Sequence, residues 1–239
     1  MITIKTPQHI AIIPDGNRRC AKRLMKTPWK GHEWGLGKLK SVLEWCKEFG
    51  IKIITVYALS LENLKKRPKR EIEMLFRLAK KEINDIVSNE KNPVRKNKAR
   101  LMFFGNLELL PEGLQKLIKK ATEITKNNSE FFINVAIAYG GRQELVSASK
   151  EIAEKVMEGY IKPDEINENF FRQNLQTNGF PDPDLIIRTG GEKRLSNFLL
   201  FQGAYAELVF IDSYWPELTR EEFVKIIQDF GKRERRFGR

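Results

Sequence analysis

Three short apolar segments of this sequence are each followed by polar and cationic side chains that could bind phosphate groups. The first group is Asp15-Gly16-Asn17-Arg18-Arg19, which places a carboxylate, an amide and two guanidiniums around a glycine. Gly16 would let backbone N–H groups approach an anion, Asn17 and the arginines would donate hydrogen bonds, and Asp15 could hold Mg²⁺ against phosphate oxygens. Asp-Gly-Asn is also typical of an ordinary turn, and taken alone this group favours the turn.

The other two groups have the same character and the same ambiguity. Ser60–Asn63 precedes the cations of Lys65–Arg67, and these side chains would either cap the next helix or meet an anion at its N-terminus. Arg188 ends another apolar segment and is followed, beyond two glycines, by Arg194 and Ser196. Two guanidiniums and a hydroxyl suit a bidentate phosphate clamp, although a solvated basic loop fits equally well.

The composition fits a folded protein with an anionic partner. Of the 239 residues 41% are hydrophobic, and the net charge is +12. The chain can therefore bury a core, and the charge favours nucleic acid, an acidic membrane surface or phosphorylated substrates. No nucleic-acid partner is expected, because aromatic residues are not interleaved with the basic ones. A nucleotide-binding enzyme is disfavoured because Gly37-Lys38 is followed by Leu39, which breaks the Walker A pattern.

Cysteine and histidine usage limits the cofactors and the compartment. Cys20 and Cys46 are the only cysteines and His9 and His32 the only histidines, which argues against a disulfide framework, a zinc site or a histidine-rich metal centre. No apolar run approaches the roughly 18 residues that span a bilayer, and no secretory signal is recognisable. We expect a cytoplasmic protein that at most contacts a membrane surface.

Short apolar segments alternate with amphipathic ones along the chain. The predicted strands are His9–Pro14, Ile51–Leu59, Ala99–Gly105, Phe131–Tyr139, Leu185–Thr189 and Glu207–Asp212. The predicted helices follow Gly31 and cover Lys69–Ser88, Pro111–Lys126, Gly141–Gly159, Pro163–Leu175 and Thr219–Gly231. This alternation predicts one α/β domain over residues 1–239, with a mainly parallel six-stranded sheet flanked by helices. Ligands bind at the carboxyl ends of parallel strands, so the three polar groups should meet there.

Longer motifs contain these groups. They read HIAIIPDGNRR at 9–19, Gly31-His32, YALSLEN at 57–63, AYGGRQEL at 138–145 and DLIIRTGGEKRLSNFLLFQGAYAELVF at 184–210. In order and spacing they resemble the cis-prenyltransferase family, the undecaprenyl diphosphate synthases, over nearly the whole chain. The resemblance implies a parallel sheet with an apolar tunnel and a Mg²⁺-dependent transferase. Such an enzyme joins isopentenyl diphosphate to an allylic diphosphate (farnesyl or geranylgeranyl diphosphate) in the cis configuration. Its product would be a long polyprenyl diphosphate, the precursor of a glycosyl carrier lipid.

The resemblance also assigns roles to residues. The allylic diphosphate is held by Gly16, Asn17, Arg18, Arg19 and Arg67, and isopentenyl diphosphate by Arg188, Arg194 and Ser196. Asp15 is the expected Mg²⁺ ligand and acts in catalysis with His32, Ser60 and Asn63, while Lys22 and Glu62 complete the substrate-binding set. Glu207 resembles an acidic residue that helps bring Mg²⁺ to the isopentenyl site. Arg236 and Gly238 resemble a tail that completes the site of a partner subunit, which implies a homodimer.

Four positions depart from the family pattern, all on the allylic side. Arg18 and Cys20 replace a glycine and a tryptophan, Pro28 stands where an arginine is common, and Leu64 replaces an aromatic residue. The Arg18 variant resembles the archaeal branch and suggests geranylgeranyl diphosphate as the primer. Two alternatives remain. A short-chain or irregular prenyl coupling enzyme of the same fold is disfavoured by the complete Arg188 clamp, and a non-catalytic partner subunit by the complete Asp15 loop.

Two further expectations concern the product. The tunnel wall is expected in the helix Lys69–Ser88, at Leu75 and Phe76, and in a strand at Ile133 and Val135, because each buried CH₂ of a prenyl tail stabilises binding by about 0.8 kcal/mol. For any single one of these four residues, a place in the ordinary core is favoured over a place in the tunnel wall. The basic ending Lys232–Arg236 would either attract anionic headgroups or complement the dipole of a helix end.

Overall fold

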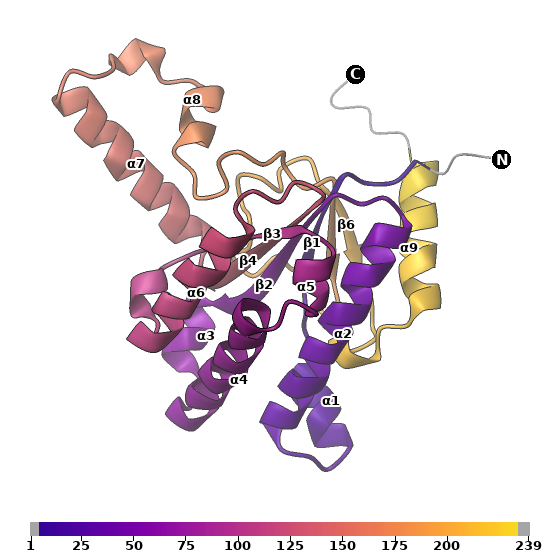
Figure 1. Cartoon of the computed structure of the whole chain (residues 1–239). Coiled ribbons are helices and arrows are strands. Elements are labelled where there is room, and N and C mark those ends of the chain that lie inside the picture. Colours follow the sequence, from indigo (N-terminus) through magenta and orange to yellow (C-terminus); the bar gives the residue numbers. More distant parts are fainter. Residues whose placement is uncertain (1–4, 234–239) are drawn as a thin grey trace.

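The computed structural model describes residues 5–233 and is built on a six-stranded sheet. Its strands are β1 (His9–Ile13), β2 (Ile53–Ser60), β3 (Ala99–Phe104), β4 (Phe131–Tyr139), β5 (Leu185–Arg188) and β6 (Glu207–Phe210). They lie in the order β3-β4-β2-β1-β5-β6, and every neighbouring pair is parallel (Figure 1). The carboxyl ends of all six strands therefore share one edge of the sheet.

Helices connect the strands and cover the sheet. Within the described residues they are α1 (Asn17–Arg23), α2 (Pro28–Glu48), α3 (Leu61–Lys66), α4 (Lys69–Ser88), α5 (Pro93–Lys96), α6 (Glu112–Thr125), α7 (Gly141–Met157), α8 (Glu168–Gln173) and α9 (Arg220–Lys232). Side chains of α2, α4, α6 and α9 pack into the larger of two cores. Figure 1 shows α7 and α8 extending away from the sheet.

Alternation along the strands fills both faces of the sheet. In β1, Ile10 and Ile12 belong to the larger core, whereas Ala11 and Ile13 belong to a smaller one on the opposite face. All residues of β1 and β5 are buried, as expected for parallel strands covered on both sides. Each fully buried isoleucine contributes about 1.5–3 kcal/mol to the free energy of folding. The apolar runs of β1 and β5 therefore favour positions inside the sheet, where both faces are covered.

The predicted mainly parallel α/β fold is confirmed, and the sheet is parallel throughout. The six strands lie within two residues of their predicted bounds. The prediction missed three helices: α1, which begins inside the predicted turn, α3 and α5. The prediction also placed the start of α2 after Gly31, which is too late. The helix starts at Pro28, with Thr27 as its N-cap. Proline suits the first helical position, where its missing N–H costs nothing.

The cysteines and the apolar content of the helices are two further features of the fold. Cys20 and Cys46 are both buried and unpaired, and burial raises the pKa of the Cys46 thiol. Between residues 5 and 233, no helix combines the length and the apolar composition needed to cross a bilayer.

A glycine sets how closely α1 approaches α2. A Cβ atom at Gly31 of α2 would lie 2.0 Å from the backbone oxygen of Asn17, the first residue of α1. Gly37, two turns further along the same helix, has nothing within 4 Å of an added Cβ. Packing therefore requires glycine at position 31 and not at position 37, so Gly37 serves as a control for Gly31 in the same helix.

We predict opposite effects of alanine at these two positions. Gly37→Ala should stabilise the protein by about 0.5–1 kcal/mol, because alanine favours an exposed helix interior. Gly31→Ala should destabilise it by about 1–3 kcal/mol, because the methyl group overpacks the contact with Asn17. Chemical denaturation of both variants measures the difference, and equal stability of the two would show that α1 does not require this approach.

Candidate active site

A polar cavity of about 930 Å³ lies at the carboxyl ends of β1, β2 and β5. It is lined by eight cationic side chains and two carboxylates. The cations are Arg18, Arg19, Lys22, Lys26, Lys66, Arg67, Arg188 and Arg194, and the carboxylates are Asp15 and Glu62. This excess of positive charge at a sheet edge favours anionic ligands that carry several charges.

Asp15 lies between arginines from two of the predicted groups. Its carboxylate accepts from Nη2 of Arg188 at 2.9 Å, pairs with Nη2 of Arg19 at 3.1 Å, and accepts from the backbone N–H of Gly16 at 2.6 Å. Burial raises the pKa of the Asp15 carboxyl, but the Arg188 and Gly16 hydrogen bonds and the charge of Arg19 outweigh it and hold the pKa below its usual value. Asp15 is therefore ionised at neutral pH.

Arg188 is the buried member of the group that it forms with Arg194 and Ser196. Only 4% of the residue is exposed, and its Nη1 donates to Oγ of Ser196 at 2.7 Å and to the backbone carbonyl of Arg194. Its Nε is buried and has no acceptor among the described residues. A buried guanidinium held in this way is preorganised for an anion, because its orientation is already fixed.

Glu192 joins the two arginine groups at the rim of the cavity. Its carboxylate pairs with Nη1 of Arg194 at 2.5 Å and with Nη1 of Arg19 at 3.4 Å. Asp15 and Glu192 thus each bridge two guanidiniums. The exchange of these carboxylates for phosphate oxygens would keep every arginine paired.

A buried glutamate that sequence reasoning missed organises the group around Arg67. Glu71, at the start of α4 and 7% exposed, accepts from Nη1 of Arg67 at 2.9 Å. It lies 3.5 Å from Nε2 of His32 and 3.7 Å from Nε of Arg18. Glu71 lies four residues after Arg67 on the sequence, a spacing that could have identified the pair.

His32 is neutral in this environment. Burial lowers its pKa to about 4, the charge of Arg67 adds to that, and Glu71 opposes it. Nη1 of Arg67 lies 3.3 Å from Nε2 of His32. Nε2 therefore accepts from Arg67 in the tautomer with the proton on Nδ1, and donates toward Glu71 in the tautomer with the proton on Nε2.

Ser60 and Asn63 lie at the N-terminus of α3 and face the cavity. Oγ of Ser60 accepts from the backbone N–H of Asn63 at 3.0 Å, so Ser60 caps the helix as predicted. The anion-site interpretation is compatible with this, because the hydroxyl proton remains available to a ligand.

Asn197 is a second residue that sequence reasoning missed. Its amide donates to Glu62 at 2.7 Å and to Gln143 at 3.0 Å, and its Oδ1 accepts from the backbone N–H of Arg142. Ser196 and Asn197 both have positive φ, 52° and 66°. Such backbone is costly for residues other than glycine and persists only where the surroundings fix it. Asn197 therefore holds the Ser196 loop in place.

The structure brings most of the predicted site residues together. Lining the cavity are Asp15, Gly16, Asn17, Arg18, Arg19, Lys22, His32, Ser60, Glu62, Asn63, Arg67, Arg188, Arg194 and Ser196. The amide of Asn17, however, donates to the carbonyl of Pro14 at 3.1 Å, so this N–H already has an acceptor within the protein. Of the four departures from the family pattern, Arg18 and Pro28 line the cavity and Cys20 and Leu64 pack into the interior.

Glu207 does not reach this cavity in its own chain. It begins β6, level with Leu185 at the start of β5, whereas Arg188 ends β5 three residues later. Three residues of strand span roughly 10 Å. Glu207 is also paired with Arg233 at the end of α9. Arg236 and Gly238 lie outside the described residues.

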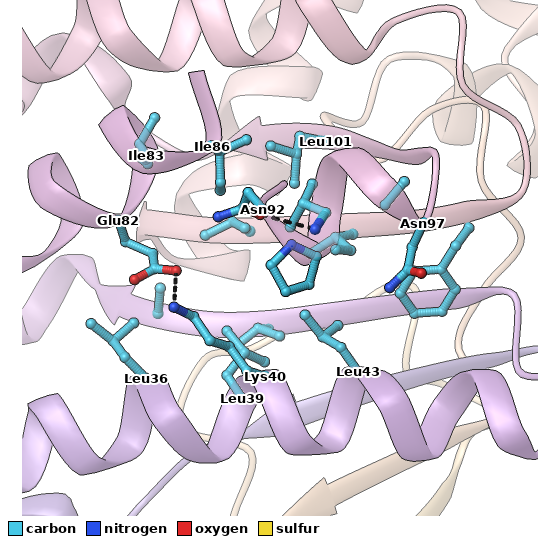
Figure 2. Close-up of a pocket in the computed structure, with 18 of the residues that line it drawn as sticks. Leu36, Leu39, Lys40, Leu43, Glu82, Ile83, Ile86, Asn92, Asn97 and Leu101 are labelled. Atoms are coloured by element: carbon cyan, nitrogen blue, oxygen red, sulfur yellow. Dashed lines mark hydrogen bonds and ion pairs between the residues drawn. The ribbon is translucent and has the colours of Figure 1, made fainter. Parts of the chain in front are cut away.

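An apolar channel begins beside the polar cavity. It has a volume of about 170 Å³ and runs between α2, α4 and the strands β2, β3 and β4. Figure 2 shows Leu36, Leu39 and Leu43 of α2 facing Ile83 and Ile86 of α4 and Leu101 of β3. The predicted Ile133 and Val135 line it, whereas Leu75 and Phe76 do not and pack against the larger core.

Ala58 is the residue at which the channel meets the cavity. It lines both spaces and is the exposed member of the otherwise buried strand β2. The pairing of β2 with β4 shifts register between Tyr57 and Leu59, so Ala58 lies at a β-bulge. Bulges re-aim side chains next to active sites, and a small side chain here leaves the passage open.

The fit of Mg²⁺ rests on Asp15. No cluster of three or more His, Cys, Asp or Glu side chains suited to a metal is present in residues 5–233. Mg²⁺ commonly takes one or two carboxylates together with substrate phosphate oxygens. An ionised Asp15 beside arginines that could bind phosphate matches that donor set.

Comparisons with known proteins agree with this arrangement. Residues 13–238 match the family described as "Putative undecaprenyl diphosphate synthase". Proteins from Methanopyrus kandleri and Pyrococcus furiosus, both named tritrans,polycis-undecaprenyl-diphosphate synthase (geranylgeranyl-diphosphate specific), are 49% and 47% identical over 98% of this chain and 86% and 87% of theirs. The crystal structure of lavandulyl diphosphate synthase from Lavandula x intermedia in complex with dimethylallyl diphosphate superposes with a TM-score of 0.91 at 35% identity, over 98% of this chain and 99% of that one. A protein from Campylobacter jejuni, described as a "probable undecaprenyl diphosphate synthase", gives 0.79 at 36% identity, over 98% and 100%.

We predict that His32 titrates near pH 4 and not near 6.5. The sequence has two histidines, so its imidazole NMR signals are few, and His32→Gln identifies the His32 signal. Because the unfolded chain binds this proton first, His32 should reduce stability as pH falls from about 6.5 to about 4. Replacing Arg67 by Met should raise the midpoint, since its charge disfavours the imidazolium. A His32 midpoint near 6.5 in the unaltered protein would contradict the neutral assignment.

Proposed function

Because the chain belongs to the undecaprenyl diphosphate synthase family of cis-prenyltransferases, we propose that it condenses isopentenyl diphosphate with an allylic diphosphate and so elongates a prenyl chain. The observation that carries the proposal is the pairing of two anion-binding groups through Asp15 and Arg188, beside an apolar channel. Two anionic head groups would bind in the cavity while an apolar tail enters the channel.

The finer proposal concerns primer and product. The relatives named geranylgeranyl-diphosphate specific support geranylgeranyl diphosphate as the primer. The same relatives, named undecaprenyl-diphosphate synthases, support a long polyprenyl diphosphate as the product, a precursor of glycosyl carrier lipids, and the channel would hold the first part of its tail. Arg18, which lines the allylic side of the cavity, adds a cation where the family pattern has a glycine.

The cations of the cavity serve the leaving group. As the allylic C–O bond breaks, its electron pair passes to a diphosphate oxygen beside Arg19 and Arg67. Each preorganised donor of this kind is worth about 3 kcal/mol in the transition state. The allylic carbon then bonds to the double bond of isopentenyl diphosphate, and the condensed chain gives a proton to the released diphosphate as the new cis double bond forms. Asp15 would hold Mg²⁺, which when bound would supply charge neutralisation at the diphosphate.

The second diphosphate belongs to Arg188, Arg194 and Ser196. On its binding, the guanidiniums exchange Asp15 and Glu192 for phosphate oxygens, and Asp15 becomes free to hold Mg²⁺. His32 contributes a hydrogen bond and no charge, because it is neutral. Glu71 is a positioning residue, since it acts through Arg67 and His32.

The homodimer forms part of the proposal. Glu207 lies beside Arg233 at the sheet edge away from its own cavity, so Glu207, and with it Arg236 and Gly238, would serve the cavity of the other subunit. β6 is an edge strand with an exposed Leu208, and Tyr205 beside it is 71% exposed. Exposed apolar side chains on a sheet edge are typical of a subunit interface.

A second candidate function is short-chain or irregular prenyl coupling. The observation that favours it is the backbone similarity to lavandulyl diphosphate synthase. The channel beside the cavity disfavours it, because a short product has no use for that space.

We predict Mg²⁺-dependent incorporation of radiolabelled isopentenyl diphosphate with an allylic primer, best with geranylgeranyl diphosphate. Dimethylallyl, geranyl and farnesyl diphosphates serve as competing primers, and chromatography sizes the products. Asp15→Asn should lower kcat on the order of 10²–10³-fold, and Asp164→Asn, an exposed aspartate far along the chain, should not. A ladder of long products supports the proposal, a single short product supports the second candidate, and no incorporation with any primer contradicts both.

We predict that Ala58 controls product length. Ala58→Phe should fill the junction of cavity and channel and stop elongation after few additions, while the first condensation continues. Ala58→Ser, which changes the volume little, should keep the product distribution. Gel or thin-layer sizing of products compares the variants, and unchanged long products in Ala58→Phe would exclude this passage.

A further inference from the structure

The apolar channel has a second end, opposite the active site. Its wall follows β4 from Ile137 beside the cavity to Phe131 at the strand's first residue. At that end lies a separate hollow of about 280 Å³, whose lining shares Lys47, Asn97 and Phe131 with the channel. Only these three side chains form the common wall. The channel therefore runs along the strands, from their carboxyl ends to their amino ends, and ends beside this hollow.

The hollow is strongly basic, and we call it the lysine hollow. Its charged lining residues are Lys47, Lys52, Lys96, Lys98 and Glu130. Lys47 donates to Oδ1 of Asn97 at 2.7 Å. Within residues 5–233, no ion pair is formed by Lys52, Lys96 or Lys98, all of which are exposed. Four cations thus face one carboxylate.

The surrounding segment extends the charge. Within residues 91–100 the cations are Lys91, Arg95, Lys96, Lys98 and Arg100, and no acidic residue interrupts them. The nearby carboxylates contact other partners than the lysines of the hollow. Glu90 lies 3.9 Å from Arg95, Glu44 accepts a hydrogen bond from Asn97, and Glu48 pairs with Arg220. The net charge around the end of the channel is therefore positive.

The length of the channel makes its far end relevant. The six residue-to-residue steps from Phe131 to Ile137 of β4 span roughly 20 Å. Each five-carbon prenyl unit adds four chain bonds of roughly 1.5 Å, or about 6 Å, so about three extended units fill this length. A longer tail has to coil within the channel or leave it beside the lysine hollow.

We propose that the lysine hollow is the docking surface for an anionic lipid bilayer, which receives the growing prenyl tail from the far end of the channel. The tail-exit part rests on the proposed function, whereas docking itself does not. Cations beside the end of an apolar channel match a bilayer, which offers anionic headgroups above an apolar interior. Nucleic acid or free diphosphate would use the lysines alone and would not explain why the channel ends beside them.

The test measures binding to vesicles without any substrate. Vesicles of phosphatidylcholine alone and of phosphatidylcholine mixed with phosphatidylglycerol are sedimented with the full chain. One variant carries Lys52→Gln, Lys96→Gln and Lys98→Gln. The matched control carries Lys119→Gln, Lys120→Gln and Lys150→Gln, three exposed lysines on α6 and α7. Both variants lose three charges, so net charge cannot distinguish them.

We expect the protein to bind the anionic vesicles, and the hollow variant to bind them on the order of a hundredfold more weakly while the control is little changed. Equal weakening of both variants overturns the proposal, because net charge alone then explains binding. Absence of vesicle binding by the unaltered protein overturns the proposal as well. So does a hollow variant that binds DNA or diphosphate more weakly but binds anionic vesicles as well as the unaltered protein does.

A second measurement separates docking from catalysis. The hollow variant should condense the first isopentenyl unit at the unaltered rate in detergent, because its lysines lie away from the cavity. On anionic vesicles it should release long products more slowly than the control. Inactivity of every protein would contradict the proposed function but would leave the vesicle result valid. Normal release of long products on vesicles would overturn the tail-exit part.

Discussion

The ion pair between Asp15 and Arg188 is the contact on which the rest of the site depends. It joins the ends of β1 and β5, neighbouring strands in which Ile13 lies opposite Arg188. The hydroxyl of Thr189 donates to the carbonyl of Asp15 at 2.7 Å, and a Cβ at Gly190 would lie 2.7 Å from Arg19. Two loops about 170 residues apart in the sequence are thereby held in contact. Because Arg188 is buried, loss of Asp15 would leave a charge without its partner.

The same sheet supports two opposite environments. At the carboxyl edge, charged side chains meet because parallel strands end together, and water or anions reach them. On the face under α2 and α4, leucines and isoleucines line a dry channel along the strands. Ala58 belongs to both because a bulge in β2 turns it out of the regular pleat. A molecule with an anionic head and an apolar tail fits this junction, and neither environment alone would select it.

Sequence reasoning recovered what depends on local pattern and missed what depends on tertiary contact. Continuous apolar runs such as His9–Ile13 identified the strands, and parallel topology then brought the three polar groups to one edge. Helix α1 was missed because it has seven residues, too few for an amphipathic repeat, and because its N-cap is Gly16, with φ of 96°, instead of a typical capping side chain. Asn197 was missed because its partners Glu62 and Gln143 are distant in sequence. Glu207 follows a recognisable motif, yet its strand register places it at the other edge of the sheet.

Differences in product among proteins of this fold must arise from few side chains. The backbone is shared with a synthase of lavandulyl diphosphate and with proteins named for a far longer product, so the parallel sheet cannot determine chain length. What can vary is the cation set beside the allylic diphosphate, the width of the passage at Ala58 and the far end of the channel. In our proposal the first governs which primer binds and the second whether a tail enters. The third governs where a tail longer than the channel goes, and in this chain that end lies beside lysines.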